Sequence, residues 1–156
     1  MKRTINQVVT GKATQDGAGV KLTRVLSRPN VYAFDPFLML DAFDSTNPAD
    51  YLKGFPWHPH RGIETVTYLI SGRIEHQDSI GNKGEIIDGS CQWMTAGSGI
   101  VHQEMPKEAP HMLGVQLWLN ISKKSKMMAP AYHDIQPEMI EKVIEETGEV
   151  HVLSGN

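Results

Sequence analysis

Short apolar or alternating runs, interrupted about every ten positions by glycine, proline or Asn/Asp clusters, fill most of the 156-residue sequence. Runs of this length are typical of β-strands and are too short for most helices. They predict strands at residues 19–26, 64–70, 73–78, 84–87, 91–95, 101–104 and 114–121. Because short strands at this spacing are typical of a sandwich or barrel, the sequence predicts an all-β fold.

The other segments follow this pattern less clearly. Residues 79–84 contain turn residues and predict a hairpin loop. Residues 28–55 are rich in aromatic residues and have no clean period, so we expect a covering loop with a short strand around 37–40. Residues 137–148 are ambiguous, because their apolar positions fit one face of a helix that has Pro137 in its first turn and Gly148 after its last. The local pattern slightly favours that helix.

Composition limits the classes of partner. A chain of 156 residues can form one well-buried core, so a single domain is the default interpretation. The formal net charge of −3 and the lack of a basic run argue against direct binding to nucleic acid or an anionic membrane. No stretch resembles a signal peptide or a membrane span, so we expect a cytoplasmic protein. The single cysteine, Cys91, excludes an internal disulfide and is interpreted as a small buried apolar residue.

Two pairs of potential metal ligands stand out, His58 with His60 and His102 with Glu104. In a strand, residues i and i+2 point to the same side, so each pair can reach one point. If the strand at 64–70 continues the one that carries His58 and His60, then Glu64, Val66, Tyr68 and Ile70 share the histidines' side. Thr65 and Thr67 would then face outward, and the histidines would point into an apolar interior.

Buried imidazoles need partners, because an unpaired buried polar group costs about 1–3 kcal/mol. Three neutral imidazoles and one carboxylate suit a divalent first-row metal ion and leave coordination positions open. A single His-x-His pair is often a coincidence, but two such pairs in one β-rich chain rarely are.

The remaining histidines are expected at the surface or in ordinary hydrogen bonds; they are His76, His111, His133 and His151. His76 is expected in an exposed hairpin. Tyr68 and Trp93 are interpreted as core residues and not as a platform for substrate.

Three longer motifs, HPHRGIETVTYLISG at 58–72, HQDSIGNKGEIIDG at 76–89 and QWMTAGSGIVHQEMP at 92–106, resemble the signature of the pirin family, part of the cupin superfamily. The segments FDPFLMLDAF, QLWLN and PAYHDI also match, so the resemblance covers nearly the whole chain. It implies a cupin-type β-barrel, also called a double-stranded β-helix or jelly roll. It further implies that the metal ligands are His58, His60, His102 and Glu104. The general cupin pattern would take its carboxylate from Glu64, which we instead expect to orient a ligand histidine or a bound water.

Pirins usually contain two barrels. The resemblance therefore implies an N-terminal barrel at residues 1–135, followed at 136–156 by a linker and the opening strand of a second barrel, which is missing or cut away. By the same resemblance, residues 140–153 form a hairpin in place of the helix that the local pattern favours. We follow the family prediction for this segment.

Two functions from different classes follow from the resemblance. The first is a metal-dependent dioxygenase resembling quercetinase, which opens flavonols with dioxygen and releases carbon monoxide; Glu104 or Glu64 would accept the substrate's hydroxyl proton. The expected ion is iron, with manganese, nickel, copper, cobalt and zinc as alternatives. The second is a non-catalytic, iron-binding redox sensor that regulates a protein partner. A purely structural metal ranks last, because the ligand set contains no thiolate.

Overall fold

Antiparallel strands form the framework of the protein, as seen in a computed structural model that describes residues 4–155. The strands are β1 (Lys12–Asp16), β2 (Val20–Leu26), β3 (Phe37–Ser45), β4 (Phe55–His60), β5 (Ile63–Ser71), β6 (Ile74–Asp78), β7 (Lys83–Ile86), β8 (Cys91–Thr95), β9 (Ile100–Pro106), β10 (Met112–Asn120), β11 (Ala131–Ile135), β12 (Glu141–Glu145) and β13 (Gly148–Val152). Three short 3₁₀ helices connect them: η1 (Arg28–Asn30), η2 (Pro48–Asp50) and η3 (Pro137–Met139). Within residues 4–155, no helix has the length and apolar character needed to cross a membrane.

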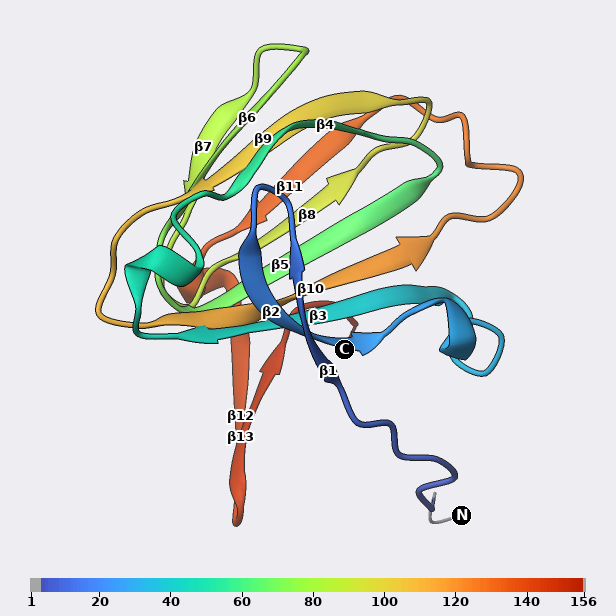
Figure 1. The fold of residues 1–156 in the computed structure, drawn as a ribbon. Helices are drawn as coiled ribbons and strands as arrows, with labels where there is room; N and C mark the ends of the chain where they lie inside the picture. The colour runs from blue at the N-terminus through green and yellow to red at the C-terminus, as the bar shows by residue number, and fades with distance from the viewer. Residues whose placement is uncertain (1–3, 156) are drawn as a thin grey trace.

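Two sheets face each other and enclose the interior of a barrel (Figure 1). The larger has seven strands in the order β1-β2-β3-β10-β5-β8-β11, and the smaller has four in the order β4-β9-β6-β7. The predicted all-β, cupin-type barrel is confirmed. All the predicted strands and the hairpin loop at 79–84 are present, with small differences at their ends.

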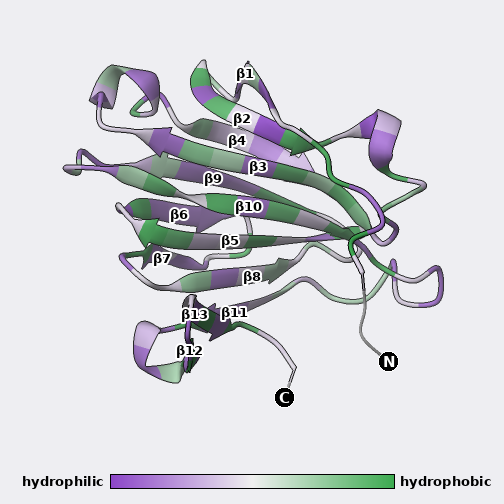
Figure 2. Ribbon diagram, turned by 90° about the horizontal axis from the view of Figure 1, so that it is seen from below, coloured by the Kyte–Doolittle hydropathy of each residue, from purple (hydrophilic) through white to green (hydrophobic). Residues whose placement is uncertain are grey.

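The interior is apolar toward one end of the barrel and polar in its middle. One buried cluster joins the two sheets and consists of Val20, Leu22, Phe43, Tyr51, Leu69, Ile74, Ile86 and Met112. A second inward cluster contains Met94, Ala96 and Ile100. Polar and charged side chains are also buried, among them His60, Thr67, His76, Gln92, His102, Glu104 and Gln116. Figure 2 shows the resulting mixture of hydrophobic and hydrophilic positions along β3, β10 and β5.

The segment at 28–55 contains more strand than the sequence predicts. The strand β3 runs for nine residues, from Phe37 to Ser45, and pairs with both β2 and β10 inside the larger sheet. The expected short strand around 37–40 is therefore only its beginning. Both faces of β3 are at least partly covered over most of its length. Such a strand lacks the clean alternation that identifies strands with one exposed face.

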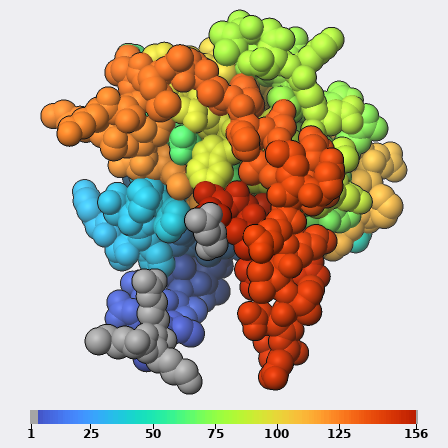
Figure 3. Space-filling model, turned by 180° about the vertical axis from the view of Figure 1, so that it is seen from behind, coloured from blue at the N-terminus to red at the C-terminus, as the bar shows by residue number. Residues whose placement is uncertain are grey.

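The C-terminal segment forms the β12–β13 hairpin, so the hairpin prediction for 140–153 is confirmed and the local preference for a helix is wrong. This hairpin projects away from the barrel (Figures 1 and 3). Its base packs on the outer face of the larger sheet, where Ile140 and Leu153 contact the cluster that contains Cys91. The 3.6-residue spacing is misleading here, because Val143 and Ile144 remain exposed and pack on no core.

The same outer cluster accounts for three side chains interpreted as core. Tyr68 and Trp93 pack against it, and the Tyr68 hydroxyl hydrogen-bonds the ring of His151. Cys91 is only 2% exposed, and burial raises the pKa of its thiol to about 11. A thiol of this kind is inert, as the sequence interpretation requires.

The orientation expected for strand β5 is wrong. Thr65 and Thr67 are buried in the barrel, whereas Ile70 is 54% exposed. The strands β4 and β5 belong to different sheets, and Gly62 lies between them with φ of 69°. Because this left-handed turn intervenes, the alternation of β4 does not continue into β5.

Candidate metal centre

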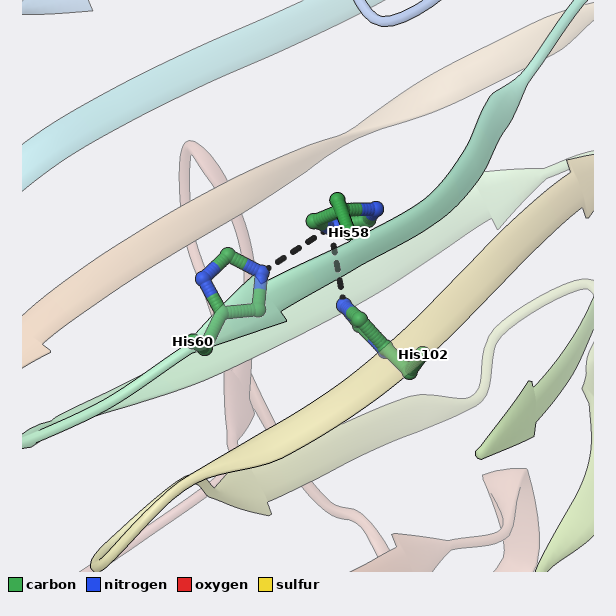
Figure 4. A group of neighbouring side chains, drawn as sticks. All are labelled: His58, His60 and His102. Carbon is green, nitrogen blue, oxygen red and sulfur yellow. Dashed lines mark hydrogen bonds between the residues drawn. The ribbon is translucent and has the colours of Figure 1, made fainter. Parts of the chain in front are cut away.

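Three histidines from neighbouring strands converge inside the barrel (Figure 4). His58 and His60 lie on β4, and His102 lies on β9 directly opposite His58. The Nε2 atom of His58 lies 3.0 Å from Nε2 of His60 and 3.0 Å from Nε2 of His102. One ring nitrogen from each of the three lies within 4.8 Å of the others, so the group could hold a metal ion.

The surroundings of His58 favour a lone pair that points at the other two rings. The Nδ1 atom of His58 lies 2.8 Å from the carbonyl oxygen of Pro56. Because a carbonyl only accepts, the proton of the neutral ring belongs on Nδ1, and Nε2 presents its lone pair to the other two histidines. Burial, together with the neighbouring histidines, lowers the pKa of His60 to about 3 and that of His102 to about 3. Neutral imidazoles with converging nitrogens fit a bound cation.

A buried carboxylate lies beside the histidines. Glu104 follows His102 by two residues on β9, and its Oε2 atom is 3.9 Å from Nε2 of His102. The Nε2 atom of Gln116 donates to both carboxylate oxygens, at 3.0 and 3.2 Å. Burial raises the pKa of Glu104, and the hydrogen bond from Gln116 opposes this rise. The pairs predicted from strand alternation thus occupy one region of the barrel.

Gln116 has its own supports, so its amide has a defined orientation. Its Nε2 atom also contacts Oγ1 of Thr67 at 3.0 Å, and the indole nitrogen of Trp118 donates to its Oε1 atom at 3.3 Å. The Trp118 ring packs edge-on against His60, with ring centroids 5.0 Å apart. Neither Gln116 nor Trp118 was identified from the sequence. Their signal is the spacing of two within QLWLN, which places both on one face of β10.

The prediction that His76 lies in an exposed hairpin is wrong. His76 is only 4% exposed, and its ring stacks on Tyr132 with centroids 5.5 Å apart. It faces inward because β6 alternates Ile74, His76 and Asp78 toward the interior. Neither ring nitrogen has a hydrogen-bond partner within residues 4–155, and burial lowers the pKa of the ring.

The remaining predicted residues lie outside the cluster. The carboxylate of Glu64 accepts a hydrogen bond of 2.8 Å from the hydroxyl of Thr95, and Glu64 is absent from the lining of the cavity beside the histidines. His111 contacts Asp44 at 2.7 Å, and His133 is exposed, so both are in the ordinary roles expected. His151, which contacts Tyr68 and Glu149, is also in such a role.

A cavity of about 420 Å³ opens beside the histidines. His58, His60 and Glu104 form one part of its wall, and Phe55 and Trp118 form an apolar part. Asp41 also lines it, but its charge is balanced by Arg24, whose guanidinium meets both carboxylate oxygens at 2.9 and 2.7 Å. The cavity therefore combines imidazole nitrogens and a carboxylate with apolar walls, and this lining could accommodate a cation beside a small ligand.

Comparisons with known proteins show which family this chain resembles. The family model described as Pirin matches residues 19–119. A protein of Pseudomonas aeruginosa named "Putative quercetin 2,3-dioxygenase" is 50% identical over 151 residues, which cover 96% of this chain and 53% of that protein. The chain thus spans about half the length of this curated relative.

Solved structures show the same fold. A quercetin 2,3-dioxygenase from Acinetobacter baumannii superposes with a TM-score of 0.83 at 32% identity, covering 100% of this chain and 58% of the other. A bacterial pirin from Escherichia coli in complex with nickel(II) gives a TM-score of 0.62 at 28% identity, with coverage of 80% and 53%. From the matched family model and these relatives, the chain belongs to the pirin family.

Proposed function

We propose that this chain is the metal-binding part of a dioxygenase that opens flavonols and releases carbon monoxide. The observation that carries the proposal is the convergence of three Nε2 atoms beside a buried carboxylate, in the wall of a cavity with aromatic sides. Relatives named as quercetin 2,3-dioxygenases support the choice of reaction.

His58, His60, His102 and Glu104 would hold the ion. When bound, a divalent transition metal would supply an open coordination position for the hydroxyl-carbonyl edge of a flavonol and the redox chemistry that dioxygen requires. We propose iron first, and nickel is the ion named for the Escherichia coli relative.

Glu104 is our choice for the group that accepts the flavonol hydroxyl proton. Its carboxylate lines the cavity, and burial raises its pKa, which makes it a stronger base than an exposed carboxylate. Gln116 orients this carboxylate by donating to both oxygens. Glu64, the other carboxylate considered, is turned to Thr95 and does not line this cavity.

Phe55 and Trp118 would contact the aromatic body of the substrate and exclude water around it. Trp118 is itself held by its hydrogen bond to Gln116 and by the edge-on packing of His60. Trp118 and Gln116 therefore connect the bound substrate to the ring of His60 and to the carboxylate of Glu104.

The first test measures metal binding. In protein purified and loaded under the same conditions, metal per chain is determined by mass spectrometry for the parent, His60→Ala and His133→Ala. A site short of one donor loses its geometry, so His60→Ala should retain less than about a tenth of the parent's metal. His133 is exposed and outside the cluster, so His133→Ala should retain all of it.

The second test measures turnover. Metal-loaded protein is mixed with quercetin under oxygen, and flavonol absorbance and oxygen uptake are followed together. The parent and Glu64→Gln should consume both, whereas His102→Ala and Glu104→Gln should not. Full metal occupancy with no flavonol loss above the His102→Ala control would contradict the dioxygenase and favour the metal-sensing regulator. Loss of turnover in Glu64→Gln but not in Glu104→Gln would reverse the two carboxylate roles.

A further inference from the structure

A second and larger cavity adjoins the one at the histidine cluster. It has a volume of about 770 Å³ and is lined in part by Val31, Leu38 and Ile63. His60 and Trp118 line both cavities, as do Met39 and Pro59. Because these four side chains border both cavities, a ligand bound near His60 is adjacent to the larger cavity.

Three arginines line the larger cavity, and none of the described residues that line it is acidic. Arg24 is already paired with Asp41 and Asp16. Arg28 is exposed and has no ion pair with any residue from 4 to 155. Arg61 is also exposed, and its guanidinium meets only a weak neutral acceptor, the sulfur of Met127 at 3.6 Å. Two guanidinium groups are therefore available to a ligand in this cavity.

The two cavities differ in charge. In the smaller cavity, Asp16 and Asp41 are paired with Arg24, whereas the buried carboxylate of Glu104 has no ion pair with a lysine or arginine among residues 4–155. The larger cavity has the reverse composition, with arginines and no carboxylate. One side of the shared His60–Trp118 wall thus suits a cation, and the other suits an anion.

We propose that the larger cavity binds the carboxylate end of an elongated, largely apolar substrate whose hydroxyl-carbonyl end reaches the histidine cluster. This inference rests on the proposed function and names the class of its substrate as aromatic carboxylates. Val31, Leu38 and Ile63 would contact the apolar body of the ligand. Arg28 and Arg61 would bind its carboxylate, because the planar guanidinium matches carboxylate geometry.

The experiment measures binding without turnover. Nickel-loaded protein under nitrogen is titrated with 3-hydroxyflavone and, separately, with its 4′-carboxylate, and binding is followed by the fluorescence of the flavonol. The charged probe should bind about tenfold more tightly than the neutral probe, as expected for a charge-assisted contact at a partly exposed site. This preference should decrease at high salt, because both guanidiniums are accessible to solvent.

Arg28→Gln/Arg61→Gln is the decisive variant. Both residues are exposed, so the fold should survive, as checked by circular dichroism, and the ratio of the two affinities should fall to about one. The control is Arg73→Gln, because Arg73 lines neither cavity and pairs with Glu85; it should keep the parent's ratio.

Equal affinities in the parent, or a preference that survives in the double variant, would overturn the inference. In either case, turnover of neutral quercetin would leave the proposed function standing. If neither probe binds, the carboxylate site and the flavonol substrate are both wrong. A preference that depends on Arg28 and Arg61, in a protein that never consumes quercetin, would support the binding site and contradict flavonol cleavage.

Discussion

Gln116 connects the buried carboxylate to the rest of the barrel. Its amide donates to Glu104 and Thr67 and accepts from Trp118, so one side chain satisfies three polar groups. It is 8% exposed, and water has little access to replace these contacts. A buried polar network of this kind stabilises the fold only when every member is paired.

Gln116→Leu should therefore destabilise the metal-free protein by about 2 kcal/mol, because a similar volume is kept while Glu104, Thr67 and Trp118 lose partners. Urea unfolding of the parent and the variant measures this difference. The matched control is Gln77→Leu at an exposed position, which should change the free energy of unfolding by less than about 0.5 kcal/mol. Equal effects at the two glutamines would show that the network contributes nothing specific.

At the residue scale, the placement of the two candidate ligand pairs could be predicted from the sequence, whereas the side chains that contact them could not. Alternation within one strand correctly places His58 with His60 and His102 with Glu104, because this rule needs only local geometry. The contact of Gln116 with Glu104 depends on two strands that lie in different sheets. No local pattern contains that pairing. The burial of His76 was not predicted, because polar residues beside a hairpin loop are usually exposed.

At the scale of elements, the turn between β4 and β5 determines which side chains reach the interior. Gly62 has φ of 69°, and its N–H donates to the carbonyl oxygen of Gly97 at 2.8 Å. Its carbonyl oxygen accepts a hydrogen bond of 2.8 Å from Lys126. The chain therefore passes from the four-stranded sheet to the seven-stranded one within a few residues.

Gly62→Ala should destabilise the protein by about 1 kcal/mol, since an L-residue rarely adopts this backbone conformation. Space is not the cause, because an added Cβ would lie no closer than 3.5 Å to its neighbour, Lys126. Gly148→Ala is the control: Gly148 has no positive φ, an added Cβ meets nothing within 4 Å, and stability should be unchanged or slightly raised. Urea midpoints compare the two, and equal losses would contradict the conformational explanation.

The C-terminal hairpin shows where element prediction from local sequence fails. Val143 and Ile144 are exposed in the hairpin, so the apolar spacing that favours a helix does not report a buried face here. Contacts at the base of the segment favour the hairpin: Ile140 and Leu153 pack on the outer face of the sheet, and His151 hydrogen-bonds Tyr68. These anchors bring residues 140 and 153 side by side, which a hairpin allows and a helix over the same residues does not.

At the scale of the whole molecule, the barrel keeps ionisable groups in a polar middle region flanked by apolar clusters. His60 and His102 are 8% and 1% exposed, and burial holds the pKa of each at about 3, against 6.5 in an unfolded chain. In metal-free protein the unfolded state therefore binds more protons than the folded state between about pH 6.5 and pH 3. Stability contributed by these neutral rings is fully present above pH 6.5 and is lost as the pH falls toward 3.

Lowering the pH from 7 to 5 should thus reduce the free energy of unfolding of the metal-free protein by on the order of 1–2 kcal/mol per buried histidine. Burial raises the pKa of Glu104, and this works in the opposite direction: its contribution is present at low pH and is lost as the pH rises above its ordinary value of 4.5. Glu104 therefore offsets part of the loss.

Urea unfolding at a series of pH values measures the slope, and His102→Gln should flatten it because one buried imidazole is removed. The control is His133→Gln, because His133 is exposed and its replacement removes no buried imidazole. A flat parent profile from pH 7 to 5 would mean that the imidazoles are hydrated or paired in the folded protein, and that the barrel does not keep them neutral by burial.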